Sequence, residues 1–189
     1  MVYICKLYGL KEVANYWNEV LKINQWQQNR LTTIIVKKLF GTVTGKKIGI
    51  LGFAFKANTN DTRESPAIKI CSNLLIDGAR LSIYDPKVKF KEIYENLGDL
   101  NNPENQSFKV QDHISIASSY EELADGSDAI IILTEWDEFK KIEWSTISKL
   151  MRKPSWIFDC RDIIDPNHFV ESDLNIWKLG CGSNTKIIK

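Results

Sequence analysis

Several features that would point directly to a function are missing from this sequence of 189 residues. Its four cysteines are scattered, form no C-x-x-C pair and lie far from both histidines, which argues against a metal site and a disulfide framework. No apolar run is long enough to cross a bilayer, and the N-terminus shows no basic leader with a cleavage site. We therefore expect free thiols, no metal, no membrane association and a cytoplasmic location.

The sequence also has little excess charge of either sign. It contains 25 Lys and Arg residues against 24 Asp and Glu residues, for a net charge of +1. Nucleic acids and anionic membranes are bound by clustered positive charge, and here the basic residues are spread along the chain. The sequence therefore predicts no nucleic-acid partner, and evidence for function has to come from local motifs.

Proline and glycine are absent from residues 10–40, where apolar residues recur at helical spacing. This pattern predicts one long helix, or two short helices in line. About 30 helical residues would extend about 45 Å, which is more than one face of a small sheet requires. The surplus either flanks this chain's own core or is shared between two subunits. Bulky apolar residues on more than one side favour the second reading, so we expect a homodimer or higher oligomer.

From Lys46 onward, β-rich and helical segments alternate. This order predicts an α/β fold, namely a doubly wound, mainly parallel Rossmann-like sheet preceded by the long α-helix. Ligands bind outside the carboxyl ends of such strands, so the loops after these strands are the candidate sites. The expected strands are 47–53, 80–84, 113–117, 129–134, 156–159 and 175–179, and the expected helices are 67–77, 120–124 and 144–151.

The loop after the first strand fits a dinucleotide fingerprint poorly. A G-x-G-x-x-G turn needs closely spaced glycines and a helix that begins at once. Here Phe53 and Phe55 are bulky, and the next helix waits until Ser65, its expected N-cap. Phosphate binding by this loop would therefore have to come from side chains.

Lys56 and Arg63 are the cations that this loop offers to an anionic ligand. A guanidinium binds phosphate through two parallel hydrogen bonds, and an ammonium adds a point charge. The competing interpretation is that both are solvated, or that Arg63 pairs with Asp61 or Glu64. Both interpretations remain open on the sequence alone.

Three further residues end strands on the same expected edge of the sheet. Asp85 either binds ribose hydroxyls or forms a turn with Pro86. Arg161 either contacts an anionic ligand or pairs with a flanking aspartate. Cys160 is adjacent to this cation, which would lower the pKa of a thiol. Because no partner base is identifiable, the sequence favours a packing role for Cys160 over a catalytic one.

Four motifs together resemble the C-terminal part of the UDP-glucose 6-dehydrogenase family. They are G-F-A-F-K-A-N-T-N-D-T-R-E-S-P, Y-D-P-K-V, T-E-W-D-E-F-K and F-D-C-R-D. The resemblance runs from about residue 3 to 179. It implies a central dimerisation segment at 1–45 and a UDP-binding Rossmann-like domain at 46–189.

The resemblance also implies roles for individual residues. In this family, UDP-glucose is oxidised to UDP-glucuronate in two NAD-dependent steps through a thioester on a cysteine. Phe55, Lys56 and Arg161 correspond to residues that contact the UDP-sugar, and Arg63 to one that reaches the NAD side of the cleft. Neither the glycine fingerprint nor the G-G-S-C-F segment with the nucleophile occurs in these 189 residues. We therefore expect no catalytic residue here and an inactive isolated chain.

Two alternatives stay open beside this interpretation. Dehydrogenases of UDP-N-acetylmannosamine or GDP-mannose share the F-K-x-x-T-x-D-x-R-E-S-P pattern, although T-E-W-D-E-F resembles the UDP-glucose branch more closely. A non-catalytic nucleotide-sugar-binding or oligomerisation module is the second alternative. Binding of UDP by the purified chain would distinguish a binding half from a purely structural one.

Overall fold

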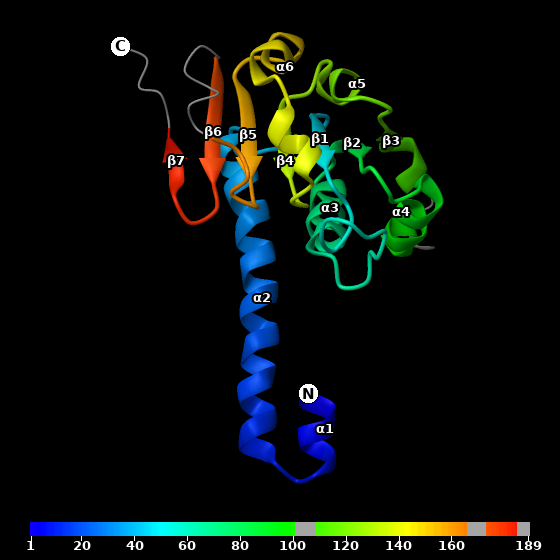
Figure 1. The fold of residues 1–189 in the computed structure, drawn as a ribbon, viewed down its shortest axis with the longest axis vertical. Helices are drawn as coiled ribbons and strands as arrows, with labels where there is room; N and C mark the ends of the chain where they lie inside the picture. The colour runs from blue at the N-terminus through cyan, green and yellow to red at the C-terminus, as the bar shows by residue number, and fades with distance from the viewer. Residues whose placement is uncertain (101–108, 166–172, 185–189) are drawn as a thin grey trace.

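A computed structural model describes residues 1–100, 109–165 and 173–184 of the chain. Within these ranges a sheet is flanked by helices, and one long helix projects from the body toward the N-terminus (Figure 1). No helix in the described ranges combines the length and apolar character needed to cross a membrane. The helices are α1 (Val2–Leu7), α2 (Lys11–Lys38), α3 (Pro66–Ile76), α4 (Phe90–Leu97), α5 (Tyr120–Ala124) and α6 (Trp144–Leu150), with 3-10 turns η1 (Gly98–Leu100), η2 (Val110–Asp112) and η3 (Asp137–Lys141).

The sheet has seven strands in the order β3-β2-β1-β4-β5-β6-β7. The first six are parallel to their neighbours, and β7 joins the edge antiparallel to β6. The strand order reverses between β1 and β4, and ligands bind at such a point in doubly wound sheets. The strands are β1 (Lys47–Leu51), β2 (Arg80–Tyr84), β3 (Ile114–Ile116), β4 (Ala129–Ile132), β5 (Ser155–Asp159), β6 (Leu174–Lys178) and β7 (Gly182–Asn184).

The predicted doubly wound fold is confirmed, and burial explains its central strands. All four residues of β4 and all five of β5 are buried, because helices cover parallel sheets on both faces. Helices α2, α3 and α4 contact one another in series, and α5 contacts α6, which gives the two helical layers.

Helix α2 is continuous over 28 residues and spans about 42 Å. Its C-terminal part belongs to the core, where Leu31 and Ile35 are buried, as is Leu39 just after the helix. Its N-terminal part leaves the body, and the short helix α1 folds back against it (Figure 1). The prediction of a long helix over 10–40 is therefore confirmed, and the break at Gly9 separates off α1, which the sequence did not predict.

Helix α3 begins as the sequence predicted. The Ser65 hydroxyl accepts a hydrogen bond from the amide of Ala67 and donates one to the carbonyl of Phe53 at 2.8 Å. Pro66 occupies the first helical position, where its missing N–H costs nothing. One side chain thus caps the helix and ties it to the loop after β1.

Several expected boundaries were wrong. β1 ends at Leu51 rather than at 53, because Gly52 turns the chain with φ +89°. β4 likewise stops at Ile132, two residues early. Helix α4 and the edge strand β7 were missed, since a lysine-rich segment and a glycine-rich terminus hide them at sequence level.

Candidate functional site

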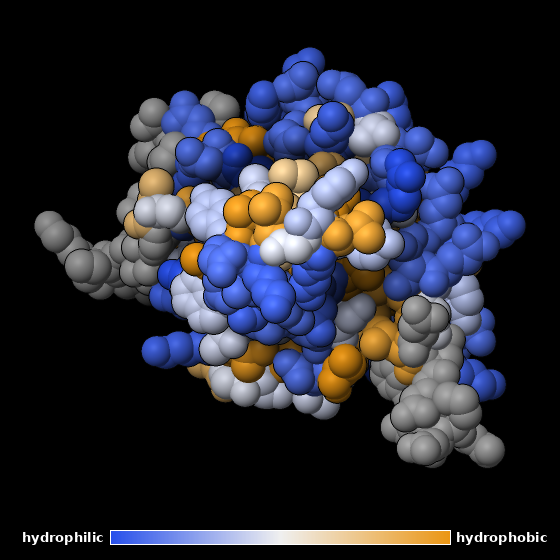
Figure 2. All heavy atoms as spheres, turned by 90° about the horizontal axis from the view of Figure 1, so that it is seen from below, coloured by the Kyte–Doolittle hydropathy of each residue, from blue (hydrophilic) through white to orange (hydrophobic). Residues whose placement is uncertain are grey.

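A cavity of about 650 Å³ opens where α2 and α3 meet the carboxyl ends of the central strands. It lies on the side of the sheet toward which α2 projects, and Figure 2 views the molecule from that end. Both α2 and α3 contribute apolar and polar side chains to its lining. The lining residues are Leu21, Asn24, Gln25, Gln27, Gln28, Leu31, Phe55, Glu64, Pro66, Lys69, Ile70, Leu133, Cys160, Arg161 and Leu179.

Arg161 lines this cavity, and protein groups hold its guanidinium through Nε. Its Nε donates to the carbonyl of Leu133 at 2.6 Å and lies 3.4 Å from Oε2 of Glu135. Its backbone N–H donates to the buried carboxylate of Asp159. Within the described ranges, Nη1 and Nη2 donate to no protein group, so the outer edge of the fork is available for a bidentate anion.

Phe55 lines the same cavity with a half-exposed ring, 46% accessible to solvent. Its backbone N–H donates to the carbonyl of Asp61, which closes the loop after β1 on itself. The next residue, Lys56, is exposed and does not line the cavity. In the part of the chain that the structure describes, Lys56 makes no hydrogen bond or ion pair, so its ammonium can still move toward a ligand.

Asp85 organises the same loop from beneath. One carboxylate oxygen accepts hydrogen bonds from the amides of Phe53 and Ala54, at 2.7 and 3.0 Å, and from the indole of Trp136. The other oxygen accepts two amides of its own turn, those of residues 87 and 88. With both oxygens engaged by protein donors, the turn-forming interpretation of Asp85 holds and the ribose-binding one does not.

Arg63 does not line the cavity. It forms a bidentate pair with Asp61, with Nε to Oδ1 at 2.9 Å and Nη2 to Oδ2 at 2.7 Å, and the Arg63 side chain is 88% exposed. The hydrogen bonds from Arg63 lower the pKa of Asp61 to about 2, and the same contact raises the pKa of Arg63. The structure thus realises the pairing that competed with ligand binding in the sequence.

Cys160 lines the cavity beside Arg161, and its Sγ lies 3.7 Å from the carbonyl oxygen of Phe158. Burial, followed by the charge of Asp159, raises the pKa of this thiol, and the opposing effect of Arg161 is smaller. A protonated thiol is a poor nucleophile, so Cys160 packs rather than reacts, as the sequence indicated.

The polar wall formed by α2 was only partly foreseen. The amide-rich stretch 24–30 lines the cavity through Asn24, Gln25, Gln27 and Gln28, beside Leu21 and Leu31 of the same helix. Lys69 and Glu64, which sequence reasoning left out of the site, line the opposite wall. The available signal for Lys69 was a single charge within the apolar first turns of α3.

The turn between β1 and α3 does not fit the pyrophosphate of a dinucleotide. Fourteen residues, 52–65, lie between the end of β1 at Leu51 and the start of α3 at Pro66, and the hydroxyl of Ser65 already caps the helix. Among the described residues, no three His, Cys, Asp or Glu side chains come together as metal ligands. The chemistry available at this cavity is anion binding by Arg161 and Lys69 together with amide hydrogen bonding.

Comparison with known proteins shows the family to which the chain belongs. The family model for the UDP binding domain of the UDP-glucose/GDP-mannose dehydrogenase family matches residues 49–166. UDP-glucose 6-dehydrogenase 2 of Oryza sativa subsp. japonica is 40% identical over 187 residues, and UDP-glucose 6-dehydrogenase 3 of Arabidopsis thaliana is 43% identical over 187 residues. Each alignment covers 95% of this chain and 39% of the relative, so the chain spans about 39% of the length of these relatives.

A solved structure shares the fold. The UDP-glucose dehydrogenase from the hyperthermophilic archaeon Pyrobaculum islandicum superimposes with a TM-score of 0.58 at 25% identity. The superposition covers 76% of this chain and 29% of that one. The similarity thus extends from sequence to the arrangement of strands and helices.

Proposed function

Because this chain belongs to the UDP-glucose/GDP-mannose dehydrogenase family, we propose that it is the UDP-sugar-binding and dimerisation part of an NAD-dependent UDP-glucose 6-dehydrogenase. The observation that supports this most strongly is Arg161, whose free guanidinium edge lines a cavity at the strand-order reversal together with Phe55. The parent enzyme would oxidise UDP-glucose to UDP-glucuronate in two steps.

In this proposal the chain's own residues bind and orient the substrate. Arg161 holds the diphosphate through Nη1 and Nη2, Lys56 adds a second positive charge, and the ring of Phe55 covers the nucleotide-sugar. NAD would accept hydride in the complete enzyme. Arg63 would face that cofactor, and to do so it has to exchange its contact with Asp61 for one with the ligand.

The helical segment at 1–45 would join two subunits, and 46–189 would form the UDP-binding domain. Supporting evidence is the set of large apolar side chains that α1 and the projecting half of α2 leave exposed. They are Tyr3, Ile4, Leu7, Tyr8, Val13, Tyr16, Ile23 and Trp26. The four free cysteines agree with a reducing, cytoplasmic location, which we also propose.

Calorimetry with UDP tests the binding role. We expect the 189-residue chain to bind UDP and R161A to weaken binding at least tenfold, because a hydrogen bond to a charged group contributes about 1.5–3 kcal/mol. Lys91→Ala is the matched control, since Lys91 is 85% exposed and, among the described residues, pairs with Glu95 alone. Equal affinities for wild type and R161A, or preference for GDP over UDP, would count against the proposal.

The same preparation tests whether the isolated chain has catalytic activity of its own. The isolated chain, given UDP-glucose and NAD, should form no NADH, because none of its described residues supplies a reactive thiolate at the cavity. Measurable NADH formation would overturn this part of the proposal.

A further inference from the structure

The carboxyl end of β4 touches both loops that carry the proposed substrate-binding residues. The carbonyl of Leu133 accepts the hydrogen bond from Nε of Arg161 at 2.6 Å. The hydroxyl of Thr134, which is fully buried, donates to the carbonyl of Ala54 at 2.7 Å. Two consecutive residues thus hold the loop after β5 and the loop after β1.

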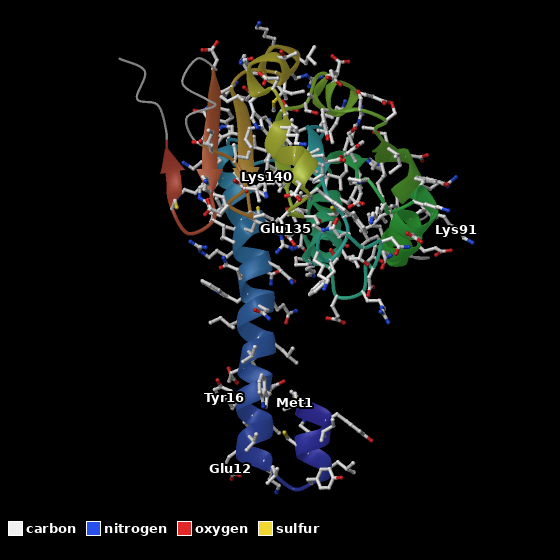
Figure 3. All side chains as sticks on the ribbon, viewed as in Figure 1. Met1, Glu12, Tyr16, Lys91, Glu135 and Lys140 are labelled. Atoms are coloured by element: carbon white, nitrogen blue, oxygen red, sulfur yellow. The ribbon has the colours of Figure 1, made fainter. Side chains whose placement is uncertain are left out.

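Glu135, the next residue, contacts both loops with a single carboxylate. Oε1 accepts a hydrogen bond from the amide of Ala57 at 3.3 Å, and Oε2 lies 3.4 Å from Nε of Arg161. The side chain is 38% exposed and lies at the end of β4 (Figure 3). It does not itself line the cavity.

We infer that Glu135 is a positioning residue that fixes the loop after β1 relative to Arg161, so that the UDP-binding residues are set before the ligand arrives; this rests on the proposed function. The amide of Ala57 belongs to the peptide that follows Lys56. Holding it restrains the segment that carries Lys56 and Phe55. On the other side, the Glu135 carboxylate lies beside Nε of Arg161, whose hydrogen is donated to the carbonyl of Leu133, and leaves Nη1 and Nη2 to the ligand.

The charge of Glu135 and its hydrogen bond to the loop have opposite expected effects on UDP binding. A carboxylate near a bound diphosphate repels it, so a purely electrostatic role predicts that neutral Gln at this position strengthens UDP binding. A positioning role depends on an acceptor for the Ala57 amide, which the Gln side-chain carbonyl can replace and Ala cannot. The pair E135Q and E135A therefore separates the two effects.

Calorimetry with UDP on the full chain gives the first readout. We expect E135A to weaken binding about tenfold and E135Q to stay within about twofold of wild type. Asp137→Ala is the control, because Asp137 is a carboxylate two residues away that is 82% exposed and, within the described ranges, pairs with Lys140 alone. Its affinity should equal that of wild type. Tighter binding by E135Q, or unchanged affinity in E135A, would overturn the inference.

Hydrogen exchange of the Ala57 amide gives a second readout that needs no ligand. Protection should be present in wild type and E135Q and lost in E135A. Unchanged protection in E135A overturns the inference whatever UDP does. A wild-type chain that binds no UDP overturns the proposed function and with it the role in substrate positioning, whereas wild-type binding with equal affinity in E135A overturns the inference alone.

Discussion

At the scale of single residues, the two arginines of the candidate site differ in what their guanidinium groups already contact. Arg63 donates to Asp61 through Nε and Nη2, whereas among the described residues the Arg161 guanidinium contacts protein groups through Nε alone. An arginine with free Nη donors in a cavity can bind an anion without breaking a contact. Arg161 is therefore ready for a ligand, and Arg63 has first to leave its partner.

The Asp61–Arg63 pair gives a pH-dependent prediction. Because the pKa of Asp61 is lowered to about 2, the pair's contribution to loop stability is present above the ordinary pKa of 3.8 and is lost as the pH falls toward 2. In Arg63→Ala, a carbon-detected NMR titration should show the Asp61 pKa returning toward 3.8. Asp137, whose pKa is lowered by its hydrogen bond from Lys140, is the internal control, and its pKa should not change in this variant. An Asp61 pKa that stays near 2 would contradict this account.

At the scale of elements, the turn after β1 depends on close backbone approach. Gly52 has φ +89°, and a Cβ built there would lie 2.4 Å from Cβ of Thr134 and 2.9 Å from its backbone nitrogen. The adjacent Thr134 hydroxyl is the donor that holds the carbonyl of Ala54. The loop that carries Phe55 can therefore lie against the end of β4 only if position 52 has no side chain.

Gly52→Ala should lower the free energy of unfolding by about 2–4 kcal/mol, because it combines an unfavourable positive φ with a clash against backbone. Urea denaturation followed by far-UV circular dichroism measures this. Gly98→Ala is the control, since a Cβ there meets no described residue within 4 Å. It should be neutral or slightly stabilising. A loss below about 1 kcal/mol in Gly52→Ala would show that β4 can shift to make room.

At the scale of the whole molecule, the projecting helices are the part that the fold leaves uncovered. In α1, Cys5 is buried, as is Ala14 in α2, so the two helices do pack together. Many of the large apolar side chains of these helices, including Tyr16 on the projecting half of α2, are exposed to solvent (Figure 3). Such a surface is unusual for a monomer and typical of an interface.

The chain of 21.7 kDa should therefore run as a dimer or larger in light scattering. Tyr16→Asp combined with Ile23→Asp should shift it toward monomer, because each change places a charge on a desolvated surface. Ile76→Asp is the control, as Ile76 is equally apolar and 66% exposed but lies at the end of α3. A wild-type chain that stays monomeric at high concentration would exclude this interface.

Most of the architecture was readable from the sequence because local signals agreed with one another. The alternation from β1 to β6 and the capping of α3 by Ser65 needed no long-range information. The contacts within the candidate site were harder to predict from the sequence. Two sets of hydrogen bonds join distant segments. Asp85 accepts from the amides of Phe53 and Ala54, about 30 positions away, and Glu135 accepts from the amide of Ala57, about 80 positions away. No local sequence pattern encodes such contacts.

Helix α2 is unbroken. It carries both the amide side chains that line the cavity, such as Asn24, Gln25 and Gln28, and the segment that packs against α1. Inserting a single residue between Ala14 and Asn24 would rotate everything before it by about 100° around the helix axis. Seven inserted residues would restore the facing to within about 20°. The length of this stretch is therefore constrained in steps of two helical turns, and related sequences should differ there by complete heptads or keep the same length.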